Sequence, residues 1–205
     1  MREQTVTFRS GELLLEGLIA KPADGTRAAV VCHPHPQYGG SMHNNVVEAM
    51  LEAMWSEQIV TLRFNFRGVG ESEGSFDGGR GEAADAAAAI DFLGSRSGVS
   101  RAEGIAAGYS FGALVGLRAG VEAEWVSDLI AVAPPIGMME LDFLAGSGKR
   151  IALIAGDRDD YCPAPKLREI CERLGSQARL KIIEGTDHFF SGFEEELAEA
   201  VKEML

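Results

Sequence analysis

Residues 104–120 read GIAAGYSFGALVGLRAG and form the most informative segment of the chain. Its first four residues form a short apolar run, Ser110 lies between Gly108 and Gly112, and an apolar segment follows. The pattern predicts a strand, a sharp turn and a helix, with the serine at the apex of the turn. Glycines suit the two flanking positions, because strand and helix pass closely there and the turn itself is strained.

Short apolar runs like the one before Ser110 recur along the chain. They lie at residues 28–32, 59–64, 129–133, 151–155 and 180–183. Helical patterns lie at residues 44–57, 82–93, 113–120, 165–174 and 193–205. Buried strands that alternate with amphipathic helices predict an α/β fold with a mostly parallel central sheet and helices on both faces.

Two further segments, residues 5–8 and 13–20, precede this alternation and are joined by a turn at Ser10 and Gly11. They predict an antiparallel hairpin at the N-terminal edge of the sheet.

The length of 205 residues suits one well-buried domain, and neither a repeat nor a linker divides it. We therefore expect a single domain over residues 1–205.

The charge of the chain restricts its partners. A formal net charge of −12 provides no basic surface for nucleic acid and disfavours anionic membranes. Residues 1–10 lack the blocks of a signal peptide, and no apolar run is long enough to cross a bilayer. We expect a cytoplasmic protein that binds neither nucleic acid nor membrane.

Its three cysteines lack metal-site spacing and are expected to be reduced thiols.

Two motifs after Ser110 supply an acid and a base. Residues 156–163 read GDRDDYCP and residues 185–190 read GTDHFF, which contains His188. A serine hydroxyl is a poor nucleophile at neutral pH unless a base such as imidazole accepts its proton. A carboxylate must in turn hold the imidazole in the correct tautomer. Because such groups collect beyond the carboxyl ends of parallel strands, these motifs predict a nucleophile, a base and an acid at one site.

On these residues the chain resembles the α/β-hydrolase superfamily over nearly its whole length. Besides the serine turn and the two late motifs, the resemblance lies in HPHP at residues 33–36 with Gly39 and Gly40, and in RFNFRGVGES at residues 63–72. The small, lidless, esterase-like or dienelactone-hydrolase-like branch is most similar. Dienelactone hydrolases proper have cysteine at the position of Ser110.

The resemblance implies a role for each member of the predicted site. Ser110 would be the nucleophile and His188 the base. The family pattern of a glycine, two variable residues, the acid and a later proline assigns the acid to Asp159. Asp157 and Asp160 are the alternatives, and we expect them instead to cap the following helix and solvate the loop.

The tetrahedral intermediate of acyl transfer requires hydrogen-bond donors for its oxyanion. The backbone N–H of Phe111 is expected to be one donor, because Phe111 directly follows the serine at the apex of the sharp turn. The second should come from the loop after residues 28–32, where Pro34 and Pro36 have no N–H to offer. The donor is then His35 or a later residue such as Gln37, and the family's usual position favours His35.

Other residues of these loops are candidates for the substrate pocket or for a metal site. The candidate apolar walls are Tyr38, Met42 and Tyr109, whose alternative role is plain packing. The spacing of His33, His35 and His43 could suggest a metal site, but acidic partners are absent nearby and the prolines indicate a stiff loop. We expect no metal and no cofactor, with these histidines fixing the loop or lining the pocket.

The glycines at 68, 70 and 74 resemble a dinucleotide-binding fingerprint, but their spacing differs from it and no helix begins at the last one. A wide turn is the better interpretation. Arg67 is expected to pair there with a carboxylate or a carbonyl.

Together these features predict a serine hydrolase, a carboxylesterase that cleaves short, uncharged acyl esters through an acyl-serine intermediate. The short substrate follows from the absence of a large lid, since residues 134–149 are the one sizeable insertion and would form only a small cover. A thioesterase, an amidase or an acyltransferase would use the same groups. A catalytically silent binding module, an obligate structural subunit and a homodimer remain open alternatives.

Overall fold

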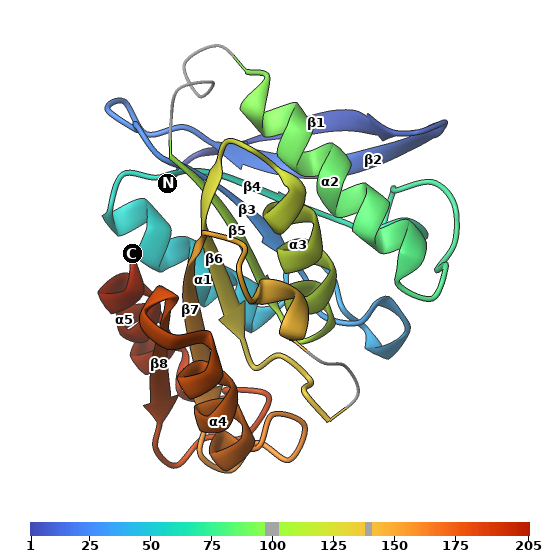
Figure 1. The fold of residues 1–205 in the computed structure, drawn as a ribbon. Coiled ribbons are helices and arrows are strands. Elements are labelled where there is room, and N and C mark those ends of the chain that lie inside the picture. Colours follow the sequence, from blue (N-terminus) through green and yellow to red (C-terminus); the bar gives the residue numbers. More distant parts are fainter. Residues whose placement is uncertain (97–102, 138–140) are drawn as a thin grey trace.

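The computed structural model describes residues 1–96, 103–137 and 141–205, and its centre is an eight-stranded sheet (Figure 1). The strands lie in the order β1-β2-β4-β3-β5-β6-β7-β8. Their bounds are β1 Glu3–Ser10, β2 Leu13–Ala20, β3 Ala28–Cys32, β4 Val60–Phe64, β5 Gly104–Tyr109, β6 Val126–Val132, β7 Arg150–Gly156 and β8 Ala178–Ile183.

The two N-terminal strands are antiparallel and the other pairings are parallel. β1 pairs with β2 and β2 with β4 in antiparallel register, whereas the strands from β4 to β8 are parallel to their neighbours. Every residue of β3, β4 and β5 is buried. This burial on both faces explains why β3 and β5 are continuous apolar runs, whereas β4 also buries the polar residues Thr61 and Arg63. The predicted mostly parallel sheet with an antiparallel N-terminal edge is confirmed.

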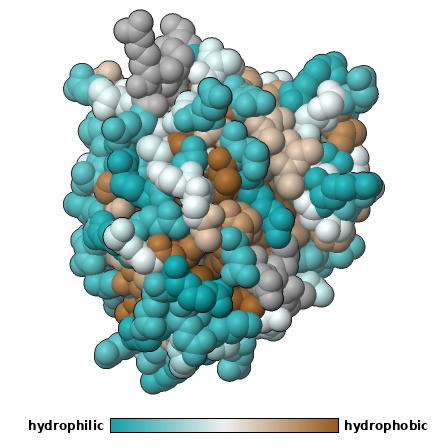
Figure 2. Space-filling model, in the orientation of Figure 1, coloured by the Kyte–Doolittle hydropathy of each residue, from teal (hydrophilic) through white to brown (hydrophobic). Residues whose placement is uncertain are grey.

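Helices cover both faces of this sheet. Their bounds are α1 Asn45–Ser56, α2 Arg80–Gly94, α3 Phe111–Glu122, α4 Ala164–Leu174 and α5 Glu194–Met204. The pair α1 and α5 packs together, and so does the pair α2 and α3. Figure 1 shows α2 and α3 in front of the sheet and α1 behind it. Figure 2 shows that this front face is largely hydrophilic, with hydrophobic residues reaching the surface in scattered patches.

The strand β6 begins earlier than the apolar pattern at residues 129–133 predicts. Its first residues include Ser127 and Asp128, whose side chains are polar. Asp128 is nonetheless buried, because its carboxylate accepts hydrogen bonds from Arg150 at 2.6 and 2.7 Å and from Ser127 at 2.7 Å. A polar residue that is buried through its partners leaves no apolar signal in the sequence.

The turn after β4 has the wide form that its sequence predicts. Arg67 follows β4, and its guanidinium lies 2.7 Å from the carboxylate of Asp85 in α2. The Asp85 side chain is fully buried and also accepts a hydrogen bond from the Arg67 backbone N–H at 3.0 Å. The expected pairing of Arg67 with a carboxylate is therefore confirmed, and it ties this turn to the first half of α2.

The segment 134–149, predicted as a small cover, is described except for residues 138–140, which lie outside the described residues. Its described parts are fastened to α4 and the turn after it. Lys166 donates a hydrogen bond to the carbonyl of Ile136 at 2.9 Å, and Gln177 donates one to the carbonyl of Leu144 at 3.2 Å. Within the described ranges, no helix is long and apolar enough to cross a membrane.

Candidate active site

Ser110 lies at the junction of β5 and α3, with its backbone in an unusual conformation. Its φ and ψ are 53° and −122°, a combination that few non-glycine residues adopt. Its N–H donates to the carbonyl of Val132 at 2.9 Å, which fixes the turn to the end of β6. The predicted order of strand, serine turn and helix is thus present, with the serine at the apex.

The two flanking glycines are required by close approach. A Cβ on Gly108 would lie 2.4 Å from the backbone of Gly112. A Cβ on Gly112 would lie 2.3 Å from the carbonyl oxygen of His33 and 2.4 Å from that of Cys32. The first turn of α3 is therefore pressed against the end of β3, which brings the loop after β3 to Ser110.

The predicted nucleophile, base and acid form one hydrogen-bonded chain. The Nε2 atom of His188 lies 3.0 Å from Oγ of Ser110, and its Nδ1 lies 2.8 Å from Oδ2 of Asp159. The Asp159 side chain is fully buried, and only 9% of the His188 side chain is exposed. The imidazole is thus oriented by a carboxylate on one side and faces the serine hydroxyl on the other.

The second carboxylate oxygen of Asp159 is also hydrogen-bonded. Its Oδ1 accepts hydrogen bonds from the N–H groups of Tyr161 and Cys162, both at 2.8 Å. Three hydrogen bonds thus compensate the burial of this carboxylate, including the one to His188. Its orientation is fixed by the backbone of its own turn.

The two alternative acids lie elsewhere. Asp157 accepts a hydrogen bond from the N–H of Gly185 at 2.7 Å, which joins the loops after β7 and β8, and Asp160 is exposed. The expectation that these two residues cap the next helix is wrong. The N-cap of α4 is Pro163, which makes no side-chain cap bond.

The side chains of the two residues predicted to supply the oxyanion donors are in contact. His35 is the N-cap of the short 3-10 helix η1, Pro36–Tyr38, and its ring centroid lies 4.8 Å from that of Phe111. Within the described residues, no backbone carbonyl accepts a hydrogen bond from the N–H of His35 or Phe111. The N–H of Gln37, the alternative donor, is occupied by Nδ1 of His35 at 3.2 Å. The geometry therefore favours His35 over Gln37.

His33 fixes the same loop from inside the protein. Its Nε2 accepts a hydrogen bond from the N–H of Phe66 at 3.1 Å, and its Nδ1 lies 2.6 Å from the carbonyl oxygen of Pro34. Burial lowers the pKa of His33 to about 4, so its ring is neutral near pH 7. Both ring nitrogens are engaged, and the part of the chain that the structure describes holds no group of three or more His, Cys, Asp or Glu that could bind a metal.

The three predicted pocket residues differ in their surroundings. Tyr38 is 87% exposed, and its ring lies 4.8 Å from that of His35. Met42 is buried, and its backbone binds Asn65 at 2.8 Å and Arg63 at 2.9 Å. Tyr109 is buried and donates its hydroxyl to the carbonyl of His188 at 2.8 Å. Their role as walls of a substrate pocket stays a prediction.

Tyr161 and Phe189 border His188 and were not predicted as site residues from the sequence. Their ring centroids lie 4.8 Å and 5.6 Å from that of the imidazole, and both side chains are more than half exposed. Their places beside the acid turn and directly after the histidine were the available signal.

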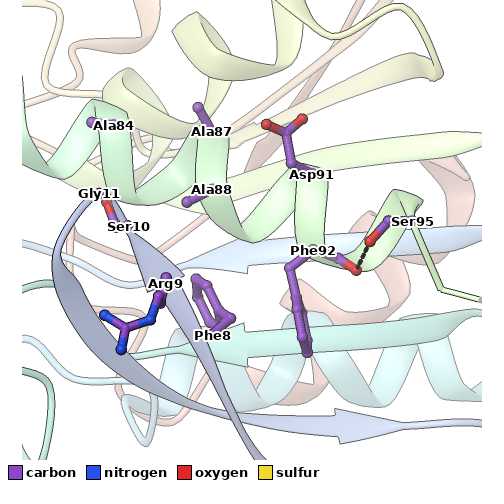
Figure 3. A pocket seen from close by; sticks show the side chains of 10 residues that line it. All are labelled: Phe8, Arg9, Ser10, Gly11, Ala84, Ala87, Ala88, Asp91, Phe92 and Ser95. Carbon is purple, nitrogen blue, oxygen red and sulfur yellow. Dashed lines mark hydrogen bonds between the residues drawn. The ribbon is translucent and has the colours of Figure 1, made fainter.

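A hollow of the surface lies away from the serine site. It is an open groove of about 630 Å³ between β1 and α2 (Figure 3). Phe8 and Phe92, which both line it, stack at 5.1 Å, and its lining includes none of the predicted site residues. The serine site is therefore located by its hydrogen-bonded side chains and not by the size of a cavity.

In sequence, the chain is similar to a protein whose name states no activity. No model of a known protein family matches the chain. An uncharacterized protein of Rickettsia prowazekii (strain Madrid E) is 33% identical over 209 residues, which cover 98% of this chain and 87% of that protein.

Solved structures extend the comparison. An alpha-beta serine hydrolase homologue from Coxiella burnetii has a TM-score of 0.91 and 30% identity, with 100% of this chain and 98% of that chain covered. A protein from Xanthomonas campestris, described as a serine hydrolase of this fold without a lid, has a TM-score of 0.88 and 32% identity, with 100% and 94% covered.

Proposed function

The chain belongs to the α/β serine hydrolase family, and from this membership and the site geometry we propose that it is a carboxylesterase for short-chain acyl esters. The observation that carries the proposal is the chain of hydrogen bonds from Ser110 through His188 to Asp159. Its order and distances match what nucleophilic catalysis by serine requires.

In the proposed mechanism, Oγ of Ser110 attacks the ester carbonyl while its proton passes to Nε2 of His188. Asp159 holds the imidazole in position and stabilises its charged form. The oxyanion of the tetrahedral intermediate accepts hydrogen bonds from the N–H groups of His35 and Phe111. The intermediate collapses when the bond to the alcohol breaks and the alcohol oxygen takes the proton from Nε2, which leaves Ser110 acylated.

The second half of the reaction reverses these roles. A water molecule attacks the acyl carbon and gives a proton to His188. The bond to Oγ then breaks, the carboxylic acid leaves, and the serine regains its proton. No cofactor enters either half, so the groups of this chain and one water molecule suffice.

The preference for short acyl groups is supported by the openness of the site. Tyr38, Tyr161 and Phe189 are all exposed around it, and the described parts of segment 134–149 are hydrogen-bonded to α4 and to the turn after it. A long acyl chain gains most of its binding energy from a deep apolar channel. We expect an open site to favour acyl groups of a few carbons.

Hydrolysis of p-nitrophenyl esters from acetate to palmitate tests this function. We expect the highest kcat/KM at acetate or butyrate. Ser110→Ala and His188→Ala should lower kcat about 10⁴-fold or more, and Asp159→Asn about 10³- to 10⁴-fold. Asp157→Asn is the matched control and should change kcat less than about tenfold, because its carboxylate accepts a hydrogen bond from the backbone N–H of Gly185 and none from a catalytic side chain within the described residues.

Three results would count against the proposal. A maximum at palmitate would overturn the short-chain preference. Unchanged turnover in Ser110→Ala would overturn the assigned nucleophile, and failure to hydrolyse any ester would overturn the esterase activity. A thioesterase, an amidase or an acyltransferase would then be tested with the same variants, since these activities use the same groups.

A further inference from the structure

The exposed aromatic side chains of this protein gather at the proposed active site. Among the described residues, the large hydrophobic side chains that are exposed are Met1, Leu14, Tyr38, Tyr161 and Phe189. The aromatic members of this set, Tyr38, Tyr161 and Phe189, all contact a histidine of the site. Exposed aromatic rings beside a reactive group are unusual enough to indicate a binding role.

Tyr161 and Phe189 contact the catalytic imidazole itself. The ring of Tyr161 is tilted by 49° to that of His188 at 4.8 Å, and the ring of Phe189 is perpendicular to it, at 89° and 5.6 Å. Yet 53% of Tyr161 and 56% of Phe189 remain exposed. Each ring therefore covers His188 with one part and offers the rest of its surface to another molecule.

Hydrogen bonds within the protein fix the backbone at Tyr161 and Phe189 in the absence of a substrate. The N–H of Tyr161 donates to Asp159 at 2.8 Å, and the N–H of Phe189 donates to Asp187 at 2.9 Å. The carbonyl of Phe189 accepts a hydrogen bond from Asn45 of α1 at 3.2 Å. Binding to a preorganised surface costs less conformational entropy than ordering a mobile loop.

The reaction assigns these rings to one part of the substrate. The alcohol oxygen must come within hydrogen-bond reach of Nε2 of His188, because it receives its proton from that atom. The oxyanion points the other way, toward the N–H groups of His35 and Phe111. The alcohol portion of the ester therefore lies on the side of the site that Tyr161 and Phe189 border.

We propose that Tyr161 and Phe189 form a binding site for a planar aromatic group on the alcohol side of the ester. This inference rests on the proposed esterase function and deepens it by naming the substrate class, esters of arylmethyl alcohols with a short acyl group. Aromatic rings favour one another in tilted and offset arrangements of the kind that these two already make with His188.

The test compares kcat/KM for benzyl acetate and cyclohexylmethyl acetate. Both esters have the same acyl group and a primary alcohol of similar size, and the cyclohexyl group is the more hydrophobic. We expect the wild type to prefer the benzyl ester about threefold to tenfold. Tyr161→Leu and Phe189→Leu should each reduce this preference, mainly by raising KM for the benzyl ester. Tyr161→Phe and Phe189→Tyr are matched controls that keep the ring and should retain it.

Several outcomes would overturn the inference. Equal or reversed preference in the wild type would do so, as would an equal loss of both activities in Tyr161→Leu and Phe189→Leu, which would indicate that the rings only shield His188. Loss of the preference in Tyr38→Leu alone would place the aromatic group on the other side of the site. Hydrolysis of both esters that depends on Ser110 but shows no preference would leave the esterase proposal standing, whereas hydrolysis of no ester at all would end both.

Discussion

Backbone strain is concentrated at single residues around the site. The non-glycine residues with positive φ in the described chain are Gln58, Ser110, Ala133 and Phe190. Three of them lie at carboxyl ends of strands or beside His188: Ser110 at 53°, Ala133 at 45° and Phe190 at 54°. Each such conformation costs about 1–3 kcal/mol and persists only where the surroundings hold it. For Ser110, those surroundings are the hydrogen bond to Val132 and the close contacts of its flanking glycines.

His33 shows how a single buried residue makes stability depend on pH. It is fully buried, and burial lowers its pKa to about 4 in the folded protein from an ordinary value of 6.5. The folded state therefore binds fewer protons than the unfolded chain between these two values. The contribution of His33 is complete above pH 6.5 and is lost as the pH falls toward 4. Between pH 7 and pH 5 this should lower the free energy of unfolding by about 2 kcal/mol.

Urea unfolding at pH 7 and pH 5 measures this loss. We expect wild type and His43→Asn to lose the same amount, because His43 is exposed. His33→Asn should be less stable at both pH values, but its loss between them should be smaller by about 2 kcal/mol. An equal loss in all three proteins would show that His33 does not carry the effect.

At the scale of elements, the site is made by the contact between the start of α3 and the end of β3. Gly112 has no room for a Cβ, since one would meet the carbonyl oxygens of Cys32 and His33 at 2.4 and 2.3 Å. The same contact brings the loop with His35 beside Phe111. Packing between two elements thus sets the separation of the two proposed oxyanion donors.

Replacing this glycine should disturb stability and activity together. Gly112→Ala must move α3 away from β3, and we expect a loss of about 2 kcal/mol or more in the free energy of unfolding. We also expect kcat for p-nitrophenyl acetate to fall about 10²-fold or more, because the proposed oxyanion donor Phe111 moves with α3. Urea unfolding and steady-state kinetics measure the two effects.

Gly116→Ala is the control on the same helix. Its Cβ would meet the Cys32 side chain at 3.0 Å and no backbone carbonyl closer than 3.5 Å. Its effect on stability should stay within about 1 kcal/mol, since the gain in helix propensity offsets the tighter contact. Equal losses of stability and of kcat in Gly112→Ala and Gly116→Ala would show that the contact between α3 and β3 does not position the site.

At the scale of the whole molecule, the order of strands and helices could be predicted because the repeating apolar runs carry that information locally. The serine turn could be predicted too, since Gly108 and Gly112 mark it in the sequence. Features made by contacts between distant segments could not. The start of β6 was not predicted, because Asp128 is polar and is buried through its bonds to Arg150. Asp157 was predicted to cap a helix, but it accepts a hydrogen bond from the N–H of Gly185 instead.

The same limit applies to the site. The sequence supplied Ser110 and His188 by motif, whereas the assignment of Asp159 over its neighbours depended on the family pattern. Tyr161 and Phe189 could not be assigned to the site from the sequence, because only the folded structure shows that their rings contact His188. Tyr161 lies in the loop after β7, and His188 and Phe189 lie in the loop after β8. For this chain of 205 residues, the fold and a candidate nucleophile could be predicted from the sequence, whereas the shape of the binding surface requires the three-dimensional contacts.

The rate of fluorophosphonate labelling of the intact protein, with mass spectrometry of its peptides, tests whether Ser110 is a nucleophile that His188 activates. We predict one adduct on Ser110 of the wild type, none at that peptide in Ser110→Ala, and labelling slowed by orders of magnitude in His188→Ala. An adduct at another residue, or labelling of Ser110 at the same rate without His188, would contradict the claim that His188 activates Ser110 as the nucleophile.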